Sequence, residues 1–77
     1  MKKEELYANI EGILELDPGT VKGDETLESL GDWNSLAIIS FIAFADGMLG
    51  LSLHPDTLKK AKTVTDLTAM VQQKISG

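Results

Sequence analysis

The chain is short, acidic and free of cysteine, and these properties exclude several classes of protein. It has 77 residues, a net charge of −5 and no cysteine, so it can form neither a disulfide nor a thiolate metal site. Its seven basic residues against twelve acidic ones argue against nucleic acid as a partner, because such binding needs a positive surface. No apolar run reaches the roughly 18 residues of a membrane span. We therefore expect one soluble, unprocessed, monomeric domain over 1–77, located in the cytoplasm.

The first predicted element is an amphipathic helix over 3–16, and a long connection over 17–34 follows it. Apolar residues of the helix recur at helical spacing, and these are Leu6, Ile10, Ile13 and Leu14. Asp17-Pro18-Gly19 is a typical end to a helix. In the connection we expect one short helical turn within 24–28 and three apolar anchors, Val21, Leu27 and Leu30. A connection this long inside a small domain is usually functional.

The second main helix is predicted over 35–49. Asn34 is a good N-cap residue, and Asp32 adds negative charge just before the helix. From residue 36 to residue 45 only Ser40 is polar. A bundle this small cannot bury every side of such a helix, so we expect part of its apolar surface to be exposed. The candidates for exposure are Ala37, Ile38, Ile42 and Ala43.

The last third of the chain is predicted to form a loop and two more helices. Pro55 suits the first position of a short helix over 55–61. Thr63 then caps the last helix, with Asp66 at the reciprocal position of a capping box. Met48 and Met70 are expected to fill gaps in the core. The predicted fold is all-α, a small irregular bundle of three main helices plus one short helix, with a long first connection.

The residues give little support for an enzyme. The single histidine, His54, precedes a proline and is remote in sequence from Ser35, whereas a catalytic triad needs an oriented base and a third group. No glycines bracket Ser35 as in a nucleophile elbow, and no glycine-rich phosphate loop is present. We expect neither catalysis nor a metal site.

The junction Trp33-Asn34-Ser35-Leu36 is the most informative segment. It places a hydroxyl at the mouth of a helix, beside the positive end of the helix dipole, where an anionic phosphate group is stabilised. The segment resembles the attachment motif of the acyl carrier protein family, Asp-Ser-Leu, with Asn34 in place of the aspartate. The resemblance extends over nearly the whole chain in length, acidity and helix order. With Trp33 at its start, the motif is similar to that of a subgroup of stand-alone bacterial carriers, in which Trp-Asp-Ser-Leu is frequent.

This resemblance implies a 4′-phosphopantetheine arm on the Ser35 hydroxyl, added by a phosphopantetheinyl transferase. The arm would carry acyl groups as thioesters between acyl-loading and acyl-using enzymes of a fatty-acid-like, polyketide or other specialised pathway. By resemblance, Asn34 and Leu36 flank the attachment site, and Leu36 anchors the start of the helix in the core. The residues expected to contact partner enzymes are Asp32, Trp33, Ile38, Ile42 and Asp46.

Two departures from the family pattern sharpen these expectations. Asn34 lacks a charge that, by resemblance, helps the transferase, which predicts slower loading or a dedicated transferase. The helix over 35–49 carries only one acid, Asp46, so docking should depend on apolar contact and on the acids of 24–32. Two alternatives remain open at this point. One is a peptidyl or aminoacyl carrier of the same fold, and the other is an unmodified helical module that docks through its apolar helix.

Overall fold

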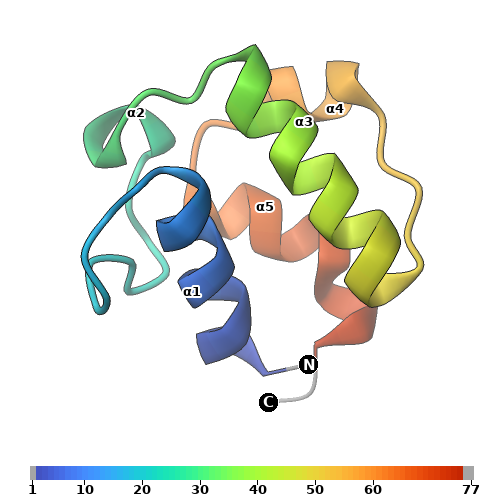
Figure 1. Ribbon diagram of the computed structural model, residues 1–77, viewed down its shortest axis with the longest axis horizontal. Coiled ribbons are helices and arrows are strands. Elements are labelled where there is room, and N and C mark those ends of the chain that lie inside the picture. The colour runs from blue at the N-terminus through green and yellow to red at the C-terminus, as the bar shows by residue number, and fades with distance from the viewer. Residues whose placement is uncertain (1, 76–77) are drawn as a thin grey trace.

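The computed structural model describes residues 2–75 as five α-helices joined by loops (Figure 1). They are α1 (Lys3–Ile13), α2 (Leu27–Leu30), α3 (Ser35–Phe44), α4 (Pro55–Lys60) and α5 (Val64–Val71). A π turn, Ala45–Leu49, continues α3, and a 3₁₀ turn, Gln72–Lys74, follows α5. The predicted all-α fold is confirmed, and the helical turn expected within 24–28 lies slightly later in the chain, as α2. No helix within residues 2–75 is long and apolar enough to cross a membrane.

The core lies where α1, α3, α4 and α5 meet, and each of these helices contributes to it. Its fully buried side chains include Leu6, Ile10, Phe41, Leu58 and Leu67. Helices as short as these are marginal in isolation, so their stability depends on this shared packing. Phe41 is the central core residue of α3, and its ring centroid lies 5.6 Å from that of Phe44.

The helix caps follow the predictions closely at three sites. The Asn34 side chain accepts a hydrogen bond from the Ala37 N–H at 3.0 Å, and Pro55 opens α4. Thr63 and Asp66 form the complete capping box at the start of α5. Asn34 and Thr63 thereby supply acceptors for N–H groups that a helix start otherwise leaves unpaired.

The first helix ends three residues earlier than predicted, at Ile13. Glu15 adopts the left-handed conformation, with φ at 58°. The Leu16 N–H then turns back to the Glu11 carbonyl at 2.8 Å, and the Glu15 N–H turns back to the Gly12 carbonyl at 3.3 Å. This is the Schellman pattern, formed here with a glutamate where glycine is usual, so no residue before Asp17 indicated the end of the helix.

The long connection is held against the start of α5 by backbone hydrogen bonds. The Leu27 backbone N–H donates to the Lys62 carbonyl at 2.8 Å, and the Val64 backbone N–H donates to the Glu25 carbonyl at 2.9 Å. They flank an isolated antiparallel bridge between Thr26 and Thr63. The predicted anchors are confirmed, since Val21 and Leu27 are buried and Leu30 packs against the core. The connection is therefore an integral part of the packed domain.

Candidate functional site

Ser35 is the first residue of α3, and its side chain is exposed. Asn34, directly before it, has an extended backbone, with φ at −106° and ψ at −172°, and caps the helix. Helix geometry leaves the N–H groups of Ser35 and Leu36 without intrahelical acceptors. The first turn of α3 contains no acidic residue. The hydroxyl therefore lies at the positive end of a ten-residue helix, in a position that favours an attached anion.

Two hydrogen bonds between Asn34 and Asp32 order the residues just before Ser35. The Asn34 amide nitrogen donates to an Asp32 carboxylate oxygen at 3.2 Å, and the Asn34 backbone N–H donates to the Asp32 carbonyl at 2.9 Å. Asp32 and Asn34 are both exposed. The predicted site residues Asp32, Asn34 and Ser35 are thus brought together in one small, exposed cluster.

Trp33 fixes this cluster to the body of the protein. Its indole N–H donates to the Leu58 carbonyl of α4 at 3.3 Å. Its ring also meets the Phe41 ring edge-on, with centroids 6.2 Å apart. Trp33 is half-buried, so it links the loop before α3 to both α3 and α4 and leaves only part of its ring at the surface.

The structure corrects two expectations about the helix after Ser35. Leu36 is 72% exposed, so the expectation that it anchors the helix in the core is wrong. Ile38, expected to contact partners, is only 5% exposed and faces the core. The reason is the phase of the buried stripe, which runs through Ala37, Ile38, Phe41 and Ala45 and turns position 36 outward. Ile42 is half-buried and packs against the core.

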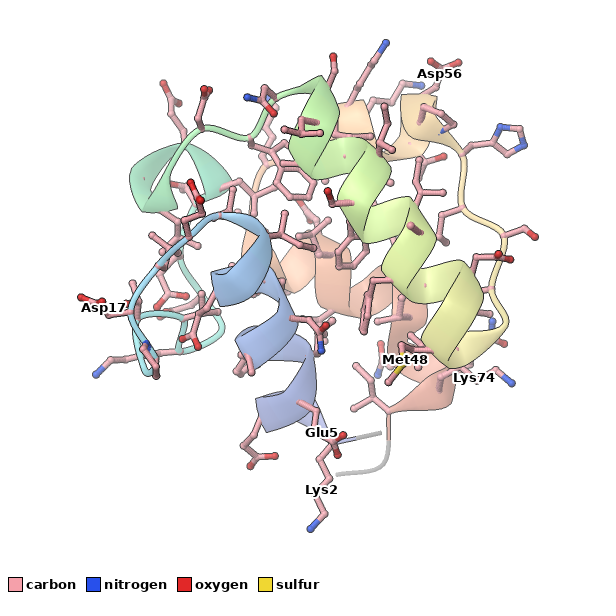
Figure 2. The ribbon with its side chains drawn as sticks, in the orientation of Figure 1. Lys2, Glu5, Asp17, Met48, Asp56 and Lys74 are labelled. Atoms are coloured by element: carbon pink, nitrogen blue, oxygen red, sulfur yellow. The ribbon has the colours of Figure 1, made fainter. Side chains whose placement is uncertain are left out.

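The large apolar side chains exposed on this helical run are Leu36, Ile39 and Met48, of which Ile39 was not singled out from the sequence. Ile39 lies one turn beyond Leu36 on the side away from Phe41, so the two share one exposed face, which the nearly uniform apolar sequence of α3 does not by itself indicate. Met48 is 70% exposed, so the prediction that it fills the core is wrong, and Figure 2 shows it at the far end of the run. Asp46 is also exposed, about 16 Å along the helix from Ser35 at 1.5 Å per residue.

The arrangement suits covalent display of a group better than chemistry within a pocket. A phosphodiester on the Ser35 hydroxyl would lie beside the free N–H groups of the first turn, while its distal end would remain in solvent. The residues present therefore fit a phosphate-linked prosthetic group. His54 is an exposed residue at the start of α4 whose side chain makes no capping hydrogen bond.

Comparison with known proteins agrees with this geometry. The family model described as "Phosphopantetheine attachment site" matches residues 4–71, which is most of the chain. No curated protein and no solved structure gives a significant match. The matched family is defined by covalently attached 4′-phosphopantetheine, and its members are carrier proteins. With an exposed serine at a helix mouth and a match of this extent, the chain belongs to the phosphopantetheine-dependent carrier protein family.

Proposed function

We propose that the chain is an acyl carrier protein that bears its 4′-phosphopantetheine arm on the Ser35 hydroxyl. One observation carries this proposal. Ser35 is an exposed hydroxyl at the first position of a long helix, inside the segment that the family model matches. The arm's thiol would hold the acyl group as a thioester. The protein itself would display this group to other enzymes without acting as a catalyst.

Loading would proceed by phosphoryl transfer from coenzyme A under catalysis by a phosphopantetheinyl transferase. A bond forms between the Ser35 oxygen and the phosphorus that carries pantetheine. The pyrophosphate bond breaks, adenosine 3′,5′-bisphosphate leaves, and the serine proton passes to a base on the transferase. Within this chain, Asn34 holds the start of α3 in place through its bond to Ala37, and the first-turn N–H groups stabilise the new phosphodiester.

The surface around Ser35 supports docking that is mainly apolar, with an acidic border. Leu36 and Ile39 are exposed on α3. Asp32, which precedes Ser35 in the sequence, is also exposed. Residues 35–45 carry no charge at all. We infer that partner enzymes contact Leu36 and Ile39, together with Asp32, Asp46 and the exposed part of Trp33. A surface so poor in charge favours dedicated partners of a specialised pathway over a carrier that serves many enzymes.

Intact-mass measurement tests the attachment directly. The purified protein is incubated with coenzyme A and a promiscuous phosphopantetheinyl transferase, and we expect the mass to rise by one phosphopantetheinyl group. Ser35→Ala should abolish the gain, whereas Ser52→Ala should preserve it, because Ser52 is an exposed loop serine. A protein that gains no mass, or a gain that survives Ser35→Ala, would contradict the proposal and favour the unmodified interaction module.

The class of cargo needs a separate measurement. The protein is recovered in its loaded form from the cells that make it, and the thioester-bound group is identified by mass after cleavage from the arm. We expect a carboxylic acyl chain. An α-amino acid would identify the chain as a peptidyl or aminoacyl carrier and would leave attachment at Ser35 intact.

A further inference from the structure

The side chain of Asn34 holds the Asp32 carboxylate in a fixed direction close to the attachment site. The Asn34 amide nitrogen donates to an Asp32 carboxylate oxygen at 3.2 Å, and the Asn34 amide oxygen accepts from the Ala37 N–H at 3.0 Å. Both ends of the Asn34 side chain are therefore engaged. The Asn34 backbone N–H also donates to the Asp32 carbonyl at 2.9 Å. The residue that caps α3 thus also orients a carboxylate three residues before Ser35.

Capping of α3 does not account for the role of Asp32. The Asn34 side chain caps the helix through its bond to Ala37, and Asp32 lies before the first turn. The helix dipole favours a negative charge near this end, but a charge held for that purpose needs no hydrogen bond to fix its direction. Within residues 2–75, the Asp32 carboxylate bonds to Asn34 alone and forms no ion pair. It is therefore oriented, exposed and available to a partner.

The surface beside Asp32 has the composition of a site for a cation. Asp32 lines a hollow of about 500 Å³ that lies toward α2 and the end of α4, together with Glu28 and Trp33. The Trp33 indole N–H already donates to the Leu58 carbonyl, so the ring offers the hollow an aromatic surface and no donor. Carboxylates next to an aromatic ring suit a guanidinium or ammonium group.

The chemistry of loading indicates where such a cation would come from. Coenzyme A carries a diphosphate and a 3′-phosphate, so a transferase that binds it needs cationic groups around its active site. When the Ser35 hydroxyl reaches the phosphorus, Asp32 is brought to the edge of that site, because two residues separate it from Ser35. Residues 33–45 carry no charge. Asp32 is therefore the acid closest to Ser35 in the sequence.

We propose that Asp32, oriented by Asn34, pairs with a basic side chain of the phosphopantetheinyl transferase and so positions the Ser35 hydroxyl for phosphoryl transfer. Asn34 is then a positioning residue that acts through Asp32. This inference rests on the proposed attachment at Ser35. The bonds that form and break on loading are those given above, and Asp32 neither gains nor loses a proton.

The rate of loading tests the pairing. Transfer from coenzyme A by a promiscuous phosphopantetheinyl transferase is followed by intact mass at several carrier concentrations. Asp32→Asn should lower kcat/KM for the carrier by about tenfold or more and leave the KM for coenzyme A unchanged. Added salt should narrow the difference from the wild type, because it screens an exposed charge pair.

Asp56→Asn is the matched control. Asp56 is an exposed acid in the first turn of α4, at the same end of the molecule as the start of α3 (Figure 2). This substitution removes the same charge and should change kcat/KM by about twofold at most. Helical circular dichroism establishes that each variant is folded, and Asp32→Ala provides a second variant without the carboxylate.

A double-mutant cycle tests the role of Asn34. Asn34→Thr keeps a side-chain oxygen that can cap the helix but removes the donor to Asp32. It should slow loading of the wild-type protein and cause little further loss in Asp32→Asn, because Asn34 acts through Asp32. Losses that simply multiply would contradict this coupling.

The remaining outcomes separate this inference from the proposed function. If the wild type is loaded and Asp32→Asn is loaded as fast as Asp56→Asn, the pairing is overturned while attachment at Ser35 stands. A change confined to the KM for coenzyme A would place the cation with the donor and would also overturn the pairing. A wild-type protein that is not loaded would instead count against the proposed function.

Discussion

Asn34 makes two side-chain hydrogen bonds that an aspartate at the same position could not both keep. Its carbonyl oxygen accepts from the Ala37 N–H at 3.0 Å, and its amide nitrogen donates to the Asp32 carboxylate at 3.2 Å. An aspartate could still cap the helix through the first bond. It would, however, place a second carboxylate against Asp32, and like charges at this separation repel. The asparagine thus lets a charged Asp32 remain close to Ser35.

This pairing predicts distinct effects for two substitutions of Asn34. Asn34→Ala removes the cap and should lower the free energy of unfolding by about 1 kcal/mol. Asn34→Asp keeps the cap but should also destabilise the protein at neutral pH and low salt, and the double variant Asn34→Asp/Asp32→Asn should recover the loss. Urea unfolding at low and high salt measures these differences. An Asn34→Asp protein as stable as the wild type at low salt would show that Asp32 and Asn34 are not coupled.

At the scale of elements, two carboxylates order the backbone on either side of the bridge between Thr26 and Thr63, Glu25 within the long connection and Asp66 at the start of α5. Glu25 accepts from the Lys22 and Gly23 N–H groups at 2.7 and 3.0 Å. Asp66 accepts from the Lys62 and Thr63 N–H groups at 2.9 and 3.1 Å. The backbone bond to Gly23 is the largest influence that lowers the pKa of Glu25, and the bond to Lys62 is the largest that lowers the pKa of Asp66.

These shifts predict a loss of stability in acid. A carboxyl group whose pKa is lowered by folding stabilises the folded state above its ordinary pKa. The contribution should be complete at neutral pH. It should be lost as the pH falls below the ordinary pKa values, 4.5 for Glu25 and 3.8 for Asp66, and then through the lower pKa values of the folded protein. Thermal unfolding between neutral pH and pH 3 measures the loss. The double variant Glu25→Gln/Asp66→Asn should show a flatter dependence, and an unchanged profile would contradict this assignment.

Prediction from the sequence succeeded where a signal is local and failed where it depends on packing. The caps at Asn34 and Thr63 follow from neighbouring residues alone, and both are confirmed. The exposure of Leu36 depends on which stripe of a nearly uniform apolar helix meets α1 and α4, and no pattern within α3 indicates that phase. The attachment motif was visible in the sequence, whereas the exposed apolar pair beside it, Leu36 and Ile39, depends on how α3 is placed against the other helices.

At the scale of the molecule, the domain is small enough that the connection must contribute to its core. The radius of gyration is 11.1 Å, close to the value of about 11.5 Å expected for a compact domain of this length. Val21 and Leu27 come from the connection and are buried in the same cluster as Phe41 and Leu67. Because a chain of this size buries only roughly 60% of its unfolded surface, losing these anchors would remove a substantial share of the core.

Glu11 links the connection to the first helix through the interior of the protein. It is only 6% exposed, and its carboxylate accepts from the Val21 N–H at 2.8 Å. Glu11→Ala would leave this buried N–H without an acceptor, which typically costs about 1–3 kcal/mol. Glu11→Gln should lose less, because its amide oxygen can still accept. The exposed Glu4→Ala should lose about 0.3–1 kcal/mol, because Glu4 lies in the first turn of the same helix.

Urea unfolding followed by the fluorescence of Trp33, the single tryptophan, measures all three variants. Trp33 lies in the junction before Ser35, so a coincident loss of its signal and of helical circular dichroism would show that the connection, the core and the attachment site unfold together. We expect one transition in the wild type and a lower midpoint in Glu11→Ala. If Glu11→Ala matched Glu4→Ala, the connection would not depend on this bond. The connection would then be held by its backbone hydrogen bonds to the start of α5, and the attachment site by the contacts of Trp33.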